Sequence, residues 1–109
     1  MPIKSVVQHS FIGVTAAGDN TLVAAVTGKK IRVLGAVVIG TGGANTVRFE
    51  SGASGTALTA SIDLTNQDAG GMFPIHGVGW FETAAGALLN LELANATLVE
   101  VNLVYEEIE

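Results

Sequence analysis

The sequence contains no cysteine, which excludes both a disulfide framework and a thiolate metal site. Aromatic residues make up only 6% of the 109 residues, whereas apolar residues together reach 49%. The apolar side chains are therefore mostly small and aliphatic, and they predict a thin core for a chain of this size. A thin core favours an oligomer whose subunits share apolar surface.

Basic residues are also few, with five Lys and Arg against ten Asp and Glu. The net charge of −5 argues against binding to a nucleic-acid backbone. All basic residues precede Glu50, and Asp19 is the only acidic residue before it. We expect N-terminal and C-terminal strands to lie side by side so that opposite charges meet across a sheet. The alternative is that these charges meet between subunits and help to set their pairing.

Long apolar runs are missing as well. No stretch approaches the roughly 20 apolar residues that a membrane-spanning helix needs, so we expect no membrane association. The first ten residues lack the hydrophobic region of a signal peptide. We therefore expect a protein made in the cytoplasm without export.

What the chain does contain is a series of short stretches with alternating apolar and polar residues. They recur about every ten residues between turns rich in Gly, Asn, Ser and Thr. We expect a weak first strand over Pro2–His9, a turn-rich segment over Phe11–Asn20 and strands over the following ranges: Thr21–Val26, Lys29–Gly40, Thr46–Glu50, Leu58–Thr65, Met72–His76, Gly79–Thr83 and Thr97–Glu106. Ala87–Ala94 has helical propensity, but its turn-rich flanks leave room for only two helical turns, so it also reads as a strand.

About eight strands without a helix predict an all-β chain. We expect a single domain over residues 1–109 that folds as an antiparallel jelly-roll β-sandwich, with residues 1–12 as either an N-terminal arm or the first strand.

The most informative stretch is Lys29–Gly40, which reads KKIRVLGAVVIG. Its first half alternates between apolar and basic residues, and its second half is apolar on both faces. Such a strand is half exposed to water and half covered on both sides. The outer apolar face is covered either by a packed loop of the same chain or by a neighbouring subunit. The residues predicted at a subunit interface are Lys30, Arg32, Leu34, Ala36 and Val38.

Metal-binding and catalytic patterns are weak. His9 and His76 are far apart, and neither lies in a cluster with ligand spacing, so we predict no metal site there. Asp63, Asn66 and Asp68 could offer oxygens to calcium, but their spacing does not match an EF-hand and such residues are common in turns.

Glu82 and Glu92 could form an acid/base pair, yet solvated strand faces explain them better. Trp80 and Phe81 form the only aromatic pair. They act either as core anchors or as a stacking platform for a carbohydrate, with Asp68 or His76 nearby. We expect neither an enzyme nor a cofactor.

Four segments carry a further similarity. They are Arg32–Leu34 in a strand, Phe49–Thr59 (FESGASGTALT), Gly79–Leu91 (GWFETAAGALLNL) and Tyr105 in the final strand. Together they resemble small jelly-roll head decoration (cement) proteins, which are encoded in the structural-gene region of tailed bacteriophages. The resemblance implies a structural virion protein without catalytic residues.

By this resemblance the protein is a homotrimer that binds the outer surface of the major capsid shell and stabilises it. Such proteins often grip the shell with an N-terminal arm, which makes Ile3, Lys4 and Val6 candidate capsid contacts. The alternative function is a carbohydrate-binding or fibre-tip module that attaches to the host through Trp80 and Phe81.

Overall fold

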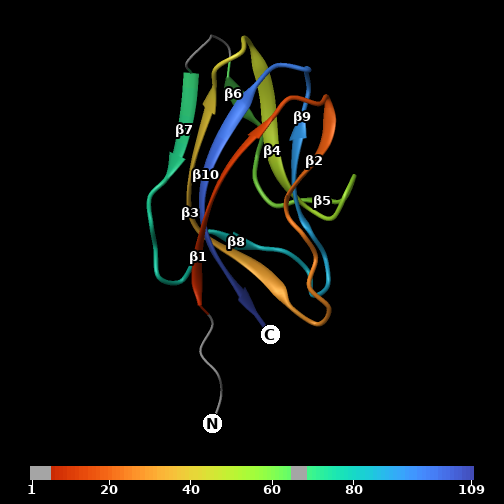
Figure 1. Ribbon diagram of the computed structural model, residues 1–109, viewed down its shortest axis with the longest axis vertical. Helices are drawn as coiled ribbons and strands as arrows, with labels where there is room; N and C mark the ends of the chain where they lie inside the picture. The colour runs from red at the N-terminus through yellow and green to blue at the C-terminus, as the bar shows by residue number, and fades with distance from the viewer. Residues whose placement is uncertain (1–5, 65–68) are drawn as a thin grey trace.

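The computed structural model describes residues 6–64 and 69–109. These residues are all-β and form two antiparallel sheets packed face to face (Figure 1). Sheet A contains, in spatial order, β1 (Val7–Val14), β10 (Val99–Ile108), β3 (Lys30–Gly40) and β7 (Ala69–Phe73), with β8 (Phe81–Glu82) also paired to β3. Sheet B contains β2 (Gly18–Val23), β9 (Leu89–Leu93), β4 (Asn45–Ser51) and β5 (Thr56–Ala57), with β6 (Ile62–Leu64) also paired to β4.

The order of the strands is that of a jelly roll. The first four strands alternate between the sheets, with β1 and β3 in sheet A and β2 and β4 in sheet B. The returning strands fit between them, since β10 lies between β1 and β3, and β9 lies between β2 and β4. Two interleaved antiparallel sheets of this kind define the jelly-roll sandwich. The predicted fold class is therefore confirmed.

The first strand is displaced from its predicted position. β1 runs from Val7 to Val14 and pairs with β10 along its whole length, from Val7 opposite Glu106 to Val14 opposite Val99. This pairing includes residues that the sequence placed in a turn-rich segment, because ladder hydrogen bonds to a neighbouring strand override weak local preference. Ile3 and Lys4 lie outside the described residues, and Val6 is exposed.

The predicted strand over Leu58–Thr65 was also wrong in extent. Only β5 and β6 pair with β4 in this region, and the residues between them are not in a strand. The hydroxyl of Thr59 accepts the hydrogen bond from the Phe49 backbone N–H at 3.2 Å. A side chain thus takes the place of a ladder carbonyl and interrupts the pairing.

A bulge at Leu34 divides β3 into two halves. Val33 lies opposite Tyr105 and Gly35 lies opposite Val104, so Leu34 has no residue opposite it on β10. One extra residue reverses the alternation between inside and outside. Val33 therefore faces the core before the bulge, and Ala36 does so after it.

The prediction that Leu34, Ala36 and Val38 form the outer face of this strand is wrong. Ala36 and Val38 belong to the hydrophobic core, and Leu34 is only 5% exposed. These side chains are buried within one chain, so they are not an interface. Beyond the bulge the outward positions are Gly35, Val37 and Ile39. The prediction failed because it continued strict alternation through a bulge that no residue type marks.

The core is centred on Phe49 of β4, which is completely buried. Its ring lies 5.0 Å from Phe81 and 6.1 Å from Phe73 between centroids, which joins β4 of sheet B to sheet A. Alternate aliphatic residues of β9 and β10 fill the remaining space between the sheets, namely Leu89, Leu91, Leu93, Val99, Val101 and Leu103. Phe49 and alternate residues of these two strands therefore face the core.

Candidate functional site

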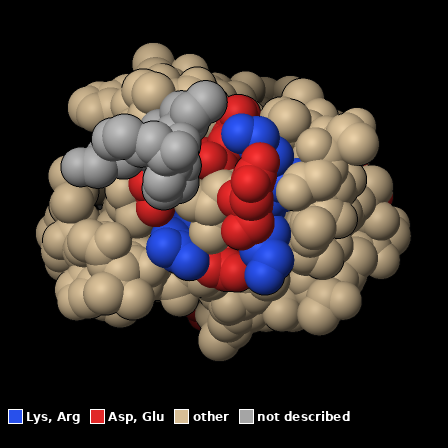
Figure 2. Space-filling model, turned by 90° about the horizontal axis from the view of Figure 1, so that it is seen from below, with Lys and Arg blue, Asp and Glu red and all other residues tan. Residues whose placement is uncertain are grey.

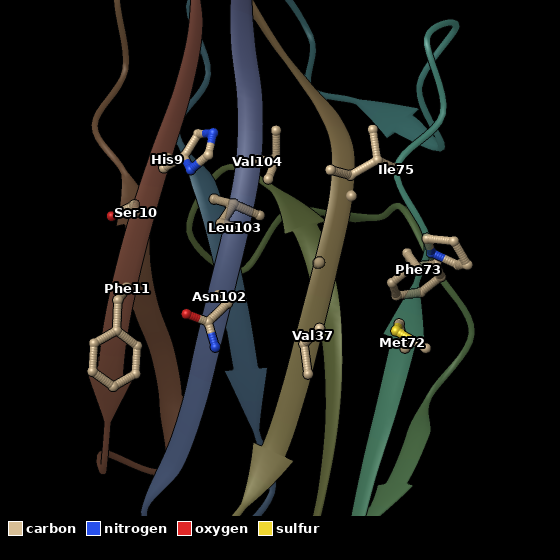
Figure 3. Close-up of a pocket in the computed structure, with 13 residues that line it drawn as sticks. His9, Ser10, Phe11, Val37, Met72, Phe73, Ile75, Asn102, Leu103 and Val104 are labelled. Carbon is tan, nitrogen blue, oxygen red and sulfur yellow. The ribbon is translucent and has the colours of Figure 1, made fainter.

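The outer face of sheet A carries an apolar surface. The register places Phe11 opposite Asn102, Asn102 opposite Val37 and Val37 opposite Met72, so these four residues form one row across β1, β10, β3 and β7. In Figure 3 their side chains follow one another across the four strands. Phe11 is 66% exposed and Met72 is 67% exposed. Exposure of this extent at two large apolar residues of one row is unusual for a surface that faces only water.

A groove of about 330 Å³ lies along this face. Phe11 lies on one side of it, and Met72 and Ile75 lie on the other (Figure 3). Its floor includes Gly35, where an added Cβ would lie 3.0 Å from Ile75 Cγ1 and 3.1 Å from the Phe73 carbonyl oxygen. The missing side chain at Gly35 therefore lets the chain after β7 pack across β3 and form one wall of the groove.

Ion pairs border this apolar surface at the lower end of sheet A. Arg32 contacts Glu82 at 3.0 Å and Glu106 at 3.7 Å, and Lys30 contacts Glu82 at 3.2 Å. Figure 2 shows basic and acidic side chains gathered at this end of the molecule. Partial burial alone would raise the pKa of Glu82, but the hydrogen bonds and charges of Arg32 and Lys30 lower it. The prediction that N-terminal basic residues meet C-terminal acidic residues across a sheet within one chain is confirmed.

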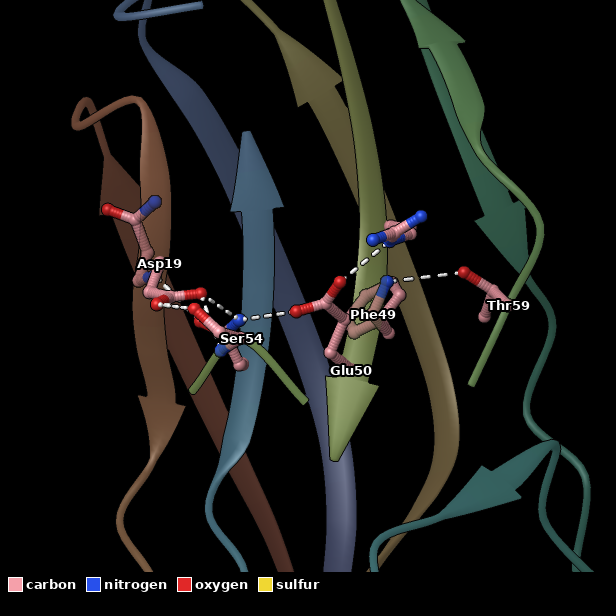
Figure 4. Close-up of polar contacts among 8 residues, drawn as sticks. Asp19, Phe49, Glu50, Ser54 and Thr59 are labelled. Carbon is pink, nitrogen blue, oxygen red and sulfur yellow. Dashed lines mark hydrogen bonds and ion pairs between the residues drawn. The ribbon is translucent and has the colours of Figure 1, made fainter. Parts of the chain in front are cut away.

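A second polar cluster covers the outer face of sheet B (Figure 4). The buried amide of Asn90 donates to Asp19 at 2.9 Å and to Glu50 at 3.0 Å. Glu50 is 1% exposed and accepts a further hydrogen bond from Arg48 Nε at 2.6 Å. The carboxylates of Asp19, Glu50 and Glu92 lie within 4.8 Å of one another. The donors around these carboxylates come from the chain itself, and the cluster ties β2, β9 and β4 together.

Asp19 also fixes the turn after β4. It accepts hydrogen bonds from the backbone N–H and the hydroxyl of Ser54, both at 2.9 Å. Ser54 has a φ of 51°, which is uncommon for a residue other than glycine. The two bonds from Ser54 lower the pKa of Asp19. Burial raises the pKa of Glu92, and the proximity of Asp19 and Glu50 raises it further.

The two predicted aromatic residues have different environments. Phe81 packs inside the core against Phe49 and Phe73. Trp80 is 48% exposed, and its indole N–H donates to the Pro74 carbonyl at 2.6 Å. Its ring lies 5.5 Å from Phe73 and 6.3 Å from His76 between centroids. Trp80 thus partly covers the aromatic cluster, and only its outer side could stack on a ligand.

The remaining candidates are dispersed. His9 is exposed on β1, whereas His76 lies in the loop after β7, where its Nδ1 accepts a hydrogen bond from the Val78 N–H at 3.3 Å. Asp63 is exposed on β6, while Asn66 and Asp68 lie outside the described residues. The carboxylates of Glu82 and Glu92 belong to different sheets, so they do not form an acid/base pair.

Sequence reasoning missed the two most organised surfaces. The row from Phe11 to Met72 depends on strand register and on the bulge, so its members give no common signal along the chain. Asp19, Glu50 and Asn90 are separated by long stretches of sequence and meet only through strand pairing. The one residue that could have indicated the apolar surface was Phe11, a large apolar residue that follows a weakly alternating stretch.

Comparisons with known proteins add no family to this picture. A scan against models of protein families gives no match, and a search of curated proteins finds no matching sequence. Within residues 6–64 and 69–109, no helix is long and apolar enough to cross a membrane.

Proposed function

We propose that this chain is a structural protein of a tailed-phage virion. It acts as a decoration, or cement, protein that binds the outer surface of the major capsid shell as a homotrimer and stabilises the shell. The observation that carries the proposal is the exposed apolar face of sheet A on a jelly-roll scaffold. A small protein with such a face is suited to bind other protein surfaces.

The motif residues support this proposal through their place in the fold. Phe49–Thr59 contains the central core phenylalanine and the turn that Asp19 fixes through Ser54. In Gly79–Leu91, the backbone N–H of Trp80 donates a hydrogen bond to the Val33 carbonyl at 2.8 Å. The residues that follow Trp80 form β8 and the start of β9. The segments that resemble decoration proteins are therefore those that hold the jelly roll together. The proposal assigns no catalytic step and no cofactor to the chain.

Purified particles of the phage that encodes the chain provide the direct test. Quantitative mass spectrometry of density-purified particles should find the chain in near-equal copy number with the major capsid protein. Particles that lack the gene should lose their genome at a lower temperature, and added purified chain should restore the temperature. A chain that is abundant in the lysate but absent from purified particles would contradict the proposal.

The exposed side of Trp80 supports a second candidate function, a carbohydrate-binding or fibre-tip module for host attachment. A glycan array of the purified chain tests it. Saturable binding that Trp80→Ala abolishes and Val78→Ala preserves would favour this module. Val78 is a matched control because it is exposed in the same loop. Absence of glycan binding would contradict this second candidate.

A further inference from the structure

We propose that the outer face of sheet A is the surface through which copies of this chain bind one another. The inference deepens the proposed function, because it assigns the surface through which the oligomer forms. The expectation of a trimer rests on that proposed function. The occupant of the groove is a second copy of the chain, and the residues that it contacts come from β1, β10, β3 and β7.

The arrangement of residues on this face is that of an interface with an apolar centre. Two neutral or apolar rows cross the middle of the sheet, one from Phe11 to Met72 and the next from His9 through Val104 to Gly35. A charged row lies below them, in which Arg32 pairs with Glu106 and Glu82. The fourth row lies on the other side of the apolar centre, runs from Gly13 through Glu100 and Ile39 to Gly70, and carries one carboxylate. An apolar centre with a polar rim is typical of protein–protein interfaces.

The distribution of charge favours a second copy on this face. The chain has a net charge of −5, so contact between two copies is favoured where it does not bring carboxylates of the two copies together. The outer face of sheet B carries the carboxylates of Asp19, Glu50 and Glu92, and contact between copies there would oppose like charges. In the two central rows of sheet A, by contrast, His9 is the only titratable residue.

The size of the face is also sufficient. Four strands about 4.8 Å apart and four rows about 6.6 Å apart give a planar area of about 500 Å². The accessible area is larger because side chains project from the plane, and a standard interface buries about 800 Å² on each partner. The apolar centre and its charged rim together therefore provide the area of a stable contact.

The shape of the face suggests how two copies fit. Phe11 projects from β1 beside the groove, and Ile75, which is 72% exposed, stands at the opposite wall (Figure 3). The groove volume of about 330 Å³ is at the lower end of pockets that take small molecules, and it can hold an aromatic side chain. In the proposed contact, Phe11 of one subunit enters the groove of its neighbour.

Sedimentation velocity of the full chain tests the inference. The unmodified chain should sediment as a trimer at micromolar concentrations. Phe11→Lys and Met72→Lys should each weaken self-association by about 30-fold or more, as expected for a central interface residue. Both side chains are exposed, so the variants should keep the far-UV circular dichroism of the folded chain. Val78→Lys is the matched control, since Val78 is 73% exposed but lies outside the rows.

Several outcomes would overturn the inference. One is an unmodified chain that stays monomeric at 200 µM, and another is an oligomer that resists Phe11→Lys and Met72→Lys. Dissociation by Val78→Lys to the same extent would place the interface elsewhere. A monomeric chain whose binding to capsids is lost in Phe11→Lys would assign this face to the shell instead.

The two proposals can fail separately. The chain could form a trimer that Phe11→Lys dissociates and yet be absent from purified particles. That result supports the interface and rejects the decoration function. A chain that is present on particles but has an oligomer insensitive to Phe11→Lys supports the function and rejects the interface.

Discussion

Replacement of Arg48 by alanine should destabilise the protein strongly, although its side chain is 45% exposed. The reason is its partner, because the Glu50 carboxylate is 1% exposed and accepts the hydrogen bond from Arg48 Nε at 2.6 Å. Without the guanidinium, Glu50 keeps only the bond from Asn90 at 3.0 Å and faces the carboxylates of Asp19 and Glu92. The variant therefore leaves a buried negative charge beside two others.

The size of the effect follows from the environment of Glu50. Removal of one partner of a buried ion pair costs about 3–5 kcal/mol. The exposed guanidinium leaves a path for water to the carboxylate, which favours the lower end, about 3 kcal/mol. For 109 residues the entropy of unfolding is about 0.23 kcal/mol per kelvin, so Tm should fall by about 13 °C.

Urea and thermal unfolding followed by circular dichroism provide the measurement. Lys30→Ala is the matched control, since Lys30 is 41% exposed, its partner Glu82 is 35% exposed and such pairs contribute up to about 1 kcal/mol. The double variant Arg48→Ala/Glu50→Gln should recover part of the loss, because the buried charge is then absent. A loss below about 1 kcal/mol for Arg48→Ala, equal to that of Lys30→Ala, would refute the reasoning.

Three further substitutions test other parts of the fold. The pKa of Glu92 is raised in the folded chain, so the fold favours its protonated form. This stabilisation is present below pH 4.5, the usual pKa of a glutamate, and is lost as the pH rises. Glu92→Gln should therefore raise the stability at pH 7 by about 0.5 kcal/mol and leave it unchanged at pH 3, and a loss at pH 7 in urea titrations would contradict this. Thr83 is buried and its hydroxyl accepts the Ile31 N–H at 2.9 Å, so Thr83→Val should cost about 1–3 kcal/mol in urea unfolding, and Thr83→Ser less. Deletion of Leu34 should keep the inward faces of both halves of β3, because Val33 and Gly35 already lie opposite consecutive residues of β10. The deletion variant should therefore fold and lose about 2–4 kcal/mol, close to Leu34→Ala, because both remove the same buried side chain; a deletion variant that does not fold would contradict this.

The parts of the fold that could be predicted are those that follow from local pattern. Alternation identified β4, β9 and β10, because one face of each strand packs on the core. Uneven charge along the chain predicted that basic N-terminal strands lie beside acidic C-terminal strands, and Arg32 and Glu82 are one such pair. These predictions needed no knowledge of register.

The parts that could not be predicted depend on how strands are aligned. The bulge at Leu34 decides whether Val37 or Val38 faces outward, and both are valines, so residue type cannot distinguish the two registers. The break after β5 depends on one hydroxyl, that of Thr59, in place of a carbonyl. The cluster of Asp19, Asn90 and Glu50 requires three strands in one alignment. In each case, a shift of one residue in strand register changes which side chains lie on the surface.

The two sheet faces together limit where a capsid shell could be bound. If sheet A binds other copies of the chain, its apolar rows are covered in the trimer. The polar groups of sheet B are engaged with one another, as the bonds of Asn90 and Arg48 to Glu50 show. The ends of the sandwich then remain for the shell. β1 begins at the lower end, and Val6, which directly precedes it, is 71% exposed (Figure 1). The proposed capsid contact through the N-terminal residues therefore agrees with the proposed use of sheet A, because the two contacts occupy different parts of the molecule.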